Sequence, residues 1–284
     1  MAAHLFAAID VGSFELEIGI YETTSRNELR EIDHLRHVIS LGRDTYHTGK
    51  ISYHLVDEMC QVLEEFAQVM KSYQVEDYRA YATSAMREAK NSQIILEAIR
   101  VRTGIQVQVI SNSEQRLLGY TAIAMKEAEF QKIIQKGTAI ADVSFGSLQI
   151  SLFDKDSLVS TQNIQQGILR LRENLSGVWS DRQTVLGIFE DMVDNELYAF
   201  KKMYLKDRDI KNLICIGESI LYLARDEVAG KRVDRISAAD FQKFYEKLIQ
   251  MPVDQIEDRF GVNQEYAHLL IPAAIIYKQI LEMT

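Results

Sequence analysis

Residues that could bind phosphate occur in two short acidic segments, "DVGS" at 10–13 and "DVSFGS" at 142–147. A glycine-containing turn between strands can aim backbone N–H groups at one anion. Gly12 would allow a positive φ there without steric cost, and Ser13 adds a hydroxyl donor. The aspartate that opens each segment could hold Mg²⁺, which keeps several waters and uses few carboxylates. One copy could equally be an ordinary hairpin turn, but two copies favour phosphate binding.

A second group of polar residues lies in "ATSAMREAKN", residues 82–91. Thr83 and Ser84 are predicted where a strand meets a helix, so their hydroxyls and the first helical N–H groups could bind an anion. Arg87, one turn further on, could offer its planar guanidinium to a phosphate. The alternative is a simple helix cap with Arg87 paired to a surface glutamate. A later turn, "CIGES" at 215–219, contributes Gly217 and Ser219.

The apolar pattern predicts the elements that hold these residues. A strand, a tight turn and a strand are expected over 5–22, followed by a strand over 31–41 and a helix over 53–72. A strand at 78–82, a helix from 83 to 104 and a helix capped by Ser113 follow. The strand–turn–strand pattern then starts again at 137, about 130 residues after the first. This period is too long for a solenoid and predicts two similar domains with a ligand cleft between them.

Composition excludes several classes of protein. The formal net charge is −9 with no compensating block of Lys and Arg, which argues against a nucleic-acid partner. The longest strongly apolar run, 269–277, is too short to cross a bilayer, so no membrane partner is expected. Cys60 and Cys215 lie far apart in no metal-binding or redox spacing, and the N-terminus does not read as a signal peptide. We therefore expect a cytoplasmic protein.

Taken together and in order, these motifs resemble the exopolyphosphatase and guanosine pentaphosphate phosphohydrolase (Ppx/GppA) family. The resemblance rests on "IDVGS", "LG" with "GKIS", "ATSAMREAKN", "TGIQVQVIS" with "SEQRLLGY", "DVSFGSLQIS", "GILRLRE", "CIGES" and "IPAAIIYKQIL". It implies an α/β fold of two actin-like domains (ribonuclease H-like, sugar kinase/Hsc70/actin superfamily) with an interdomain cleft. The implied domains are 1–126 with about 272–284, and 127–271. The extra C-terminal helical domain of longer members is not expected here.

The resemblance also implies a function: hydrolysis of the terminal phosphate of polyphosphate or guanosine pentaphosphate, with Mg²⁺ or a similar divalent cation. The expected partner is a polyphosphate or guanosine polyphosphate ligand, and a homodimer is left open. The implied catalytic residues are Glu114, Gln115 and Arg87. The implied phosphate-binding residues are Gly12, Ser13, Thr83, Ser84, Gly146, Ser147, Gly217 and Ser219. The implied metal ligands are Asp10 and Asp142.

Several departures from the family pattern lie at positions where the resemblance implies catalytic or metal-binding residues. The first loop continues "FELE" (14–17) where the family has Asn-Ser-x-Arg. Gln115 stands at the position aligned with the catalytic base, and Gln149 replaces a glutamate on the metal side. An amide can orient a water molecule but cannot take its proton. Two hypotheses therefore stay open: a hydrolase with a degenerate site, or a catalytically inactive member that binds phosphate or nucleotide and regulates.

Overall fold

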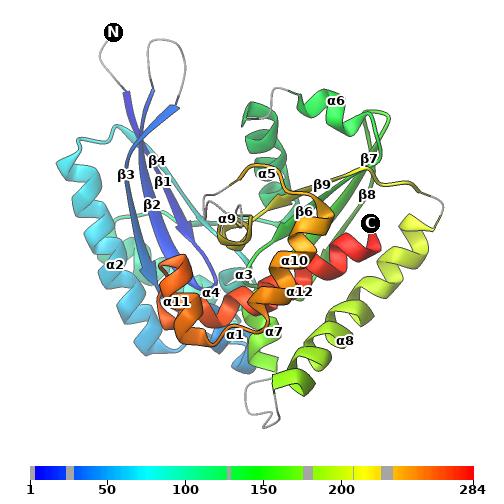
Figure 1. Cartoon of the computed structure of the whole chain (residues 1–284). Coiled ribbons are helices and arrows are strands. Elements are labelled where there is room, and N and C mark those ends of the chain that lie inside the picture. The colour runs from blue at the N-terminus through cyan, green and yellow to red at the C-terminus, as the bar shows by residue number, and fades with distance from the viewer. Residues whose placement is uncertain (1–3, 24–28, 127–128, 175–181, 207, 225–232) are drawn as a thin grey trace. The chain divides into compact units, whose positions relative to one another are not determined.

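The computed structural model describes residues 4–23, 29–126, 129–174, 182–206, 208–224 and 233–284. Its contacts divide the chain into two compact units, Met1–Gln115 and Arg116–Thr284. Each unit combines one sheet with helices (Figure 1). This division differs from the domain bounds expected from the sequence, which placed 272–284 with the first domain. The domain bounds and the interdomain cleft remain predictions, and each unit is described below by itself.

The first unit contains a five-stranded sheet among its described residues, in the order β3-β2-β1-β4-β5. β1–β3 are antiparallel neighbours, β4 runs parallel to β1, and β5 runs parallel to β4. The strands are β1 (His4–Val11), β2 (Glu15–Thr23), β3 (Leu29–Val38), β4 (Asp77–Ala82) and β5 (Gln108–Val109). The predicted hairpin is thus confirmed, whereas β3 ends before the predicted residue 41.

Four helices lie wholly within the described part of this unit: α1 (Leu41–Thr48), α2 (Tyr53–Ser72), α3 (Ser84–Glu88) and α4 (Ser92–Thr103). Helix α2 matches its predicted range and lies alongside the sheet (Figure 1), with Met59, Leu63 and Phe66 in the core. The predicted single helix over 83–104 is broken. The Asn91 side chain accepts from Ile51 N (3.1 Å) and donates to Ile51 O (2.8 Å), which fixes the chain between α3 and α4.

The second unit repeats the topology of the first with the sheet order β8-β7-β6-β9 in its described part. The strands are β6 (Thr138–Val143), β7 (Leu148–Asp154), β8 (Ser157–Ile164) and β9 (Asn212–Ile216). β6–β8 are antiparallel neighbours, and β9 is parallel to β6. The equivalence extends to the turns, because Gly12 N donates to Glu15 O (2.9 Å) and Ser144 N donates to Ser147 O (3.0 Å). The predicted internal repeat is confirmed at this level.

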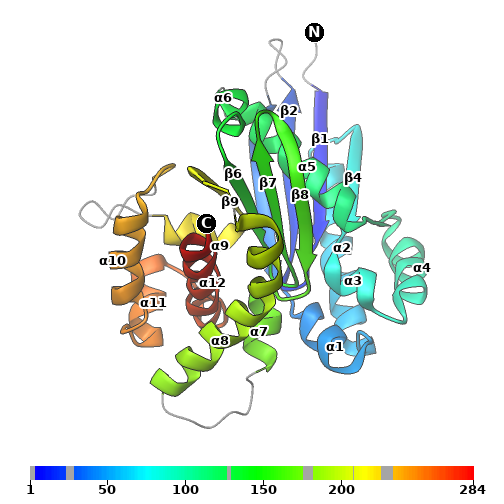
Figure 2. The same ribbon diagram turned by 90° about the vertical axis from the view of Figure 1, so that its right-hand side faces the viewer.

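Helix α12 (Gln264–Met283) is the packing centre of the second unit. Figure 2 shows it between α8 (Arg182–Phe200) and the pair formed by α10 (Ala238–Leu248) and α11 (Val253–Phe260). The other helices are α5 (Asn112–Lys126, which begins in the first unit), α6 (Phe130–Ile134), α7 (Ile168–Asn174), α8 (Arg182–Phe200, continued by a π-helical turn, Lys201–Leu205), α9 (Glu218–Leu223), α10 (Ala238–Leu248) and α11 (Val253–Phe260).

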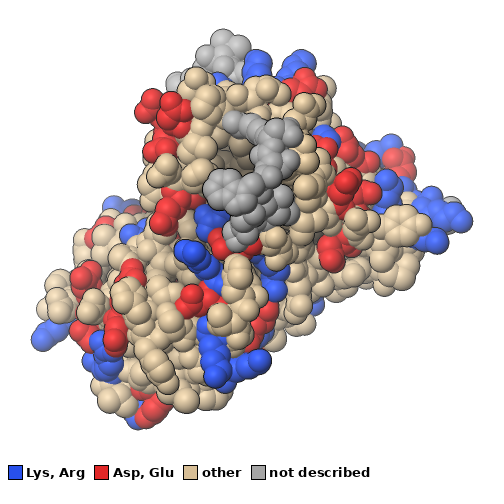
Figure 3. Space-filling view, turned by 90° about the horizontal axis from the view of Figure 1, so that it is seen from below, with Lys and Arg blue, Asp and Glu red and all other residues tan. Residues whose placement is uncertain are grey.

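The longest apolar stretch of the sequence lies in the middle of α12. Ile271 is half-buried, and the other members of the run from Leu269 to Tyr277 are buried. This burial explains the stretch as part of a core helix. In the described part of the chain, no helix combines the length and apolarity needed to cross a membrane. On the face drawn in Figure 3, basic and acidic side chains are interspersed, with no broad basic surface.

Candidate functional site

The first acidic turn is shaped by a close backbone approach. A Cβ at Gly12 would lie 2.8 Å from Glu15 O, so no larger residue fits without a shift of the backbone. Gly12 has no positive φ, so the conformational reason expected from the sequence is wrong. Its N–H donates to Glu15 O within the turn. Asp10, near the end of β1, is exposed.

Two of the expected phosphate-binding residues meet in the first unit. Ser13 and Ser84 are both buried, and their hydroxyl oxygens lie 2.8 Å apart. Tyr46 donates its hydroxyl proton to Ser13 Oγ (2.8 Å) and lies 3.2 Å from Ser84 Oγ. Ala85 N also donates to Ser13 Oγ (3.2 Å). We call Ser13, Tyr46 and Ser84 the hydroxyl cluster.

Sequence reasoning missed Tyr46 because it lies on α1, a helix that was not predicted. The contact of α1 with α3 is fixed by Thr45, whose hydroxyl donates to Ala85 O (3.2 Å). Thr83, the remaining expected phosphate-binding residue of this segment, donates its backbone N–H to Val11 O (3.3 Å) and makes no side-chain cap bond. The helix-cap alternative for this segment therefore lacks the side-chain bond that defines it.

Arg87 is half-buried and makes a backbone contact. Its Nη1 donates to Ile110 O (2.7 Å), whereas the alternative considered from the sequence was a pair with a surface glutamate. Burial lowers the pKa of the Arg87 guanidinium, and Glu88 and Tyr46 act in the opposite direction. The side chain remains a cation at neutral pH because arginine starts from a very high pKa. A partly dehydrated guanidinium of this kind is well suited to an anionic partner.

The two expected residues at the start of α5 differ in their surroundings. Ser111 N donates to Glu114 Oε2 (2.7 Å) and Glu114 N donates to Ser111 Oγ (3.2 Å), which is a capping box. The cap is thus Ser111 rather than the predicted Ser113. Hydrogen bonds from the backbone and the side chain of Ser111 lower the pKa of the exposed Glu114 carboxyl, which weakens it as a base. Gln115 Oε1 is buried and has no hydrogen-bond partner among the described residues.

The second acidic turn belongs to the second unit. Asp142 Oδ1 accepts from the Ser144 hydroxyl (2.9 Å). Gly146 and Ser147 are buried, and Leu169 N donates to Phe145 O (2.8 Å), which ties the start of α7 to the turn.

The third turn lies against the second within the same unit. Gly217 has a φ of 123°, and a Cβ there would lie 2.4 Å from Val143 O, so only glycine fits. Tyr277 donates its hydroxyl proton to Ile216 O (3.1 Å). Ser219, in the first turn of α9, is buried. The structure therefore brings the turn at Gly217 against the end of β6, one residue after Asp142.

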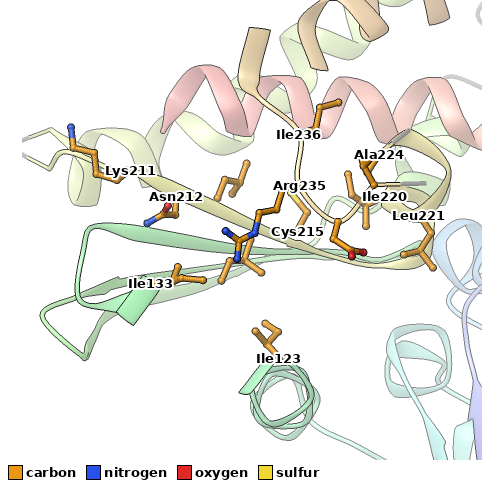
Figure 4. Close-up of a pocket in the computed structure, with 14 residues that line it drawn as sticks. Ile123, Ile133, Lys211, Asn212, Cys215, Ile220, Leu221, Ala224, Arg235 and Ile236 are labelled. Atoms are coloured by element: carbon orange, nitrogen blue, oxygen red, sulfur yellow. The ribbon is translucent and has the colours of Figure 1, made fainter. Parts of the chain in front are cut away.

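A hollow lies next to β9 in the second unit (Figure 4). Its volume is about 450 Å³, within the usual range for small-molecule pockets. Its walls are mostly apolar, with Ile123 from α5 and Cys215 from β9, and its polar groups include Asn212 and Arg235. Burial raises the pKa of the Cys215 thiol to about 12, which disfavours the reactive thiolate.

Comparison with solved structures defines the class of fold. The Aquifex aeolicus member of the Ppx/GppA family aligns with a TM-score of 0.76 at 22% identity, over 99% of this chain and 90% of that chain. An exopolyphosphatase from Cytophaga hutchinsonii aligns with a TM-score of 0.79 at 18% identity, over 99% and 91%. The expected α/β fold is thereby confirmed, with one sheet in each unit.

Comparison of sequences gives the family. The model of the Ppx/GppA phosphatase family matches residues 20–284. Exopolyphosphatase 1 of Mycobacterium tuberculosis is 23% identical over 275 residues, which cover 94% of this chain and 78% of that protein. A guanosine-5'-triphosphate,3'-diphosphate pyrophosphatase of Vibrio parahaemolyticus is 19% identical over 224 residues, covering 79% and 43%. The chain belongs to the Ppx/GppA phosphatase family, as the sequence motifs indicated.

Proposed function

We propose that this chain is a cytoplasmic phosphoanhydride hydrolase that acts on the terminal phosphate of polyphosphate or guanosine pentaphosphate with low catalytic power. Family membership supports the reaction class. The main structural observation in support of the proposed site is the contact between the buried Ser13 and Ser84 hydroxyls, whose oxygens lie 2.8 Å apart. Arg87 lies in the same unit, and its pKa responds to Tyr46 of the hydroxyl cluster.

The proposed roles follow from the chemistry of phosphoryl transfer, which requires positioning and the spreading of negative charge. Arg87 and the serine hydroxyls bind phosphate oxygens in the first unit, and the turns at 142–147 and 217–219 are the candidate anion-binding groups of the second unit. Asp10 and Asp142 carry the hard oxygen ligands that Mg²⁺ prefers, and Asp10 is exposed as a water-mediated ligand must be. A bound cation would neutralise charge on the phosphoryl group. Gln115 orients water, with its Oε1 free of a protein partner among the described residues.

A second candidate, a catalytically inactive phosphate- or nucleotide-binding regulator, is favoured by the state of Glu114. The capping box occupies this carboxylate and lowers its pKa, and a weaker base abstracts a proton less readily. Gln115 and Gln149 carry no titratable group at all. Binding would survive these changes, because the phosphate-binding side chains persist.

The hollow beside β9 bears on which substrate the protein uses, polyphosphate or guanosine pentaphosphate. A linear polyphosphate needs only a row of anion-binding groups, whereas a guanosine polyphosphate also needs room for a base. The hollow has apolar walls and includes Ile220 of α9, which starts directly after the turn at Gly217. This adjacency supports guanosine pentaphosphate as a substrate alongside polyphosphate.

The test is phosphate release from long-chain polyphosphate and from guanosine pentaphosphate with Mg²⁺. We expect slow release that Arg87→Ala abolishes and that Arg79→Ala, an exposed control on β4, leaves unchanged. No release from either substrate, with thermal stabilisation by one of them, would support the binding protein instead. Neither release nor stabilisation would refute both hypotheses.

A further inference from the structure

Three polar side chains lie side by side across the sheet of the second unit. Asp142 on β6 is directly opposite Gln149 on β7, and Gln149 is directly opposite Asn163 on β8. Directly opposite residues of antiparallel strands share one face of the sheet. Ser151, two residues further along β7, lies on the same face. Helix α5 covers that face, because Tyr120 of α5 donates its hydroxyl proton to Ser151 Oγ.

The middle of this polar row is buried without a protein partner. Gln149 is only 2% exposed, and neither its Oε1 nor its Nε2 has a hydrogen-bond partner among the described residues. The same holds for Asn163 Oδ1. Nearly all buried polar groups in proteins are hydrogen-bonded, to protein or to ordered water, so three such atoms in neighbouring residues call for an occupant.

The first unit has an equivalent row of polar side chains, and its members are paired with one another. There Asp10 is opposite Glu17, and Glu17 is opposite Arg36. Arg36 Nε lies 2.7 Å from Glu17 Oε1, so an ion pair closes that row from within the protein. In the second unit two neutral amides, Gln149 and Asn163, stand at the corresponding places, and no ion pair can form between them.

A small cavity adjoins Gln149 between the sheet and α5. Its volume is about 10 Å³, which is about the room of one water molecule. Its lining includes Asp142, Gln149, Ser151 and the α5 residues Arg116 and Tyr120. The cavity is therefore small and of mixed lining, since Ile140 and Ile216 stand beside these polar groups. A water molecule in it needs two or more of the polar groups as hydrogen-bond partners.

We propose that this cavity binds one ordered water molecule through the Gln149 side chain. Water both donates and accepts, so it can serve Nε2 or Oε1, whereas a metal ion leaves the Nε2 donors unserved and meets the positive Arg116. An anion would meet the Asp142 carboxylate. The water serves Gln149 as Arg36 serves Glu17 in the first unit. It also connects Gln149 to the polar groups around Asp142. This site does not depend on the proposed hydrolase activity.

The test combines a crystal structure of the full chain with nuclear magnetic resonance of the labelled protein. We expect electron density for one water within hydrogen-bond distance of Gln149, and a cross-relaxation signal between water and the Gln149 side-chain amide. Gln149→Met should remove both. Gln165→Met, the same change at an exposed position, should remove neither. A dry cavity in the wild-type structure would overturn the proposal, whatever the variants do.

Unfolding in urea supplies an independent readout. If water satisfies the amide, Gln149→Met should leave the folding equilibrium constant no higher than that of Gln165→Met. If the amide is unsatisfied, its removal should raise that constant by about tenfold or more, because the penalty of an orphaned buried group disappears. A third result, stabilisation of the wild type by K⁺ or Mg²⁺ that Gln149→Met abolishes, would identify a cation as the occupant and refute the proposal.

Discussion

The hydroxyl cluster gives the sharpest prediction about phosphate binding. Tyr46 donates to Ser13 Oγ at 2.8 Å and lies 3.2 Å from Ser84 Oγ. The single Tyr46 proton goes to Ser13 Oγ, so Ser84 is the donor in its contact with the Tyr46 hydroxyl oxygen. A phosphate oxygen that accepts from Ser84 must therefore compete with that tyrosine oxygen. We therefore expect Tyr46→Phe to strengthen the binding of tripolyphosphate, because the Ser84 hydroxyl proton no longer has the tyrosine oxygen as an alternative acceptor.

The magnitude follows from the one hydroxyl that is removed. A typical net contribution of a hydrogen bond is about 0.5–1.5 kcal/mol, which corresponds to about a twofold to twelvefold gain in affinity. The same loss should lower the free energy of unfolding by about 1 kcal/mol. The bond between Ser13 and Ser84 remains, so the cluster should keep its geometry.

The assay is isothermal titration of tripolyphosphate into the wild type and Tyr46→Phe, with urea unfolding of both. Tyr53→Phe is the matched control, because Tyr53 is 76% exposed at the start of α2. If Tyr46→Phe binds tripolyphosphate as weakly as the wild type, or more weakly, while it remains folded, the reasoning is wrong. Tyr46 would then be a ligand of the anion or irrelevant to it.

Three further predictions concern other parts of the chain. Gly12→Ala should destabilise the protein by about 1–3 kcal/mol in urea unfolding, because its Cβ would lie 2.8 Å from Glu15 O; unchanged stability would contradict the close approach. The Glu114 carboxyl should titrate below its ordinary pKa of 4.5, so its stabilising effect is present above the unfolded pKa and lost as pH falls through the folded one. Ser111→Ala should move that midpoint, followed by nuclear magnetic resonance, back toward the ordinary value. The pKa of the half-buried Cys215 thiol is raised to about 12, so it should react with iodoacetamide at pH 8 far more slowly in the folded protein than in urea. Equal rates would refute the raised pKa.

The sequence predicted elements whose pattern is set locally. Helix α2 was predicted over its observed range because apolar residues such as Met59 and Leu63 recur at helical spacing. Helix α1 was missed because its buried positions are Leu41, Gly42 and Thr45, which form no apolar stripe. The break before α4 depends on Asn91 bonding to Ile51, 40 residues earlier, and no local pattern records such a contact.

Prediction of the site was likewise limited by contacts between residues far apart in the sequence. Residue types placed Ser13 and Ser84 in one hypothesis, and the structure places their hydroxyls in contact. Only the fold could add Tyr46 to them, since the helix that carries it had no sequence signal. The pairing of Ser111 with Glu114 was readable in principle as Ser-x-x-Glu, the spacing of a capping box. The roles assigned to these residues remain predictions.

The internal repeat shows which features of the two acidic turns are shared between the units and which differ. Both units keep the aspartate that precedes the turn and the N–H to C=O bond that closes it. The residues opposite the two aspartates have diverged instead, to Glu17 in one unit and Gln149 in the other. A turn held by backbone bonds and close packing does not need a particular side chain on the facing strand. The family resemblance implies a carboxylate where Gln149 stands. Its replacement by an amide would remove a cation ligand and leave the backbone-held turn unchanged, so phosphate binding and hydrolysis should be measured separately in this protein.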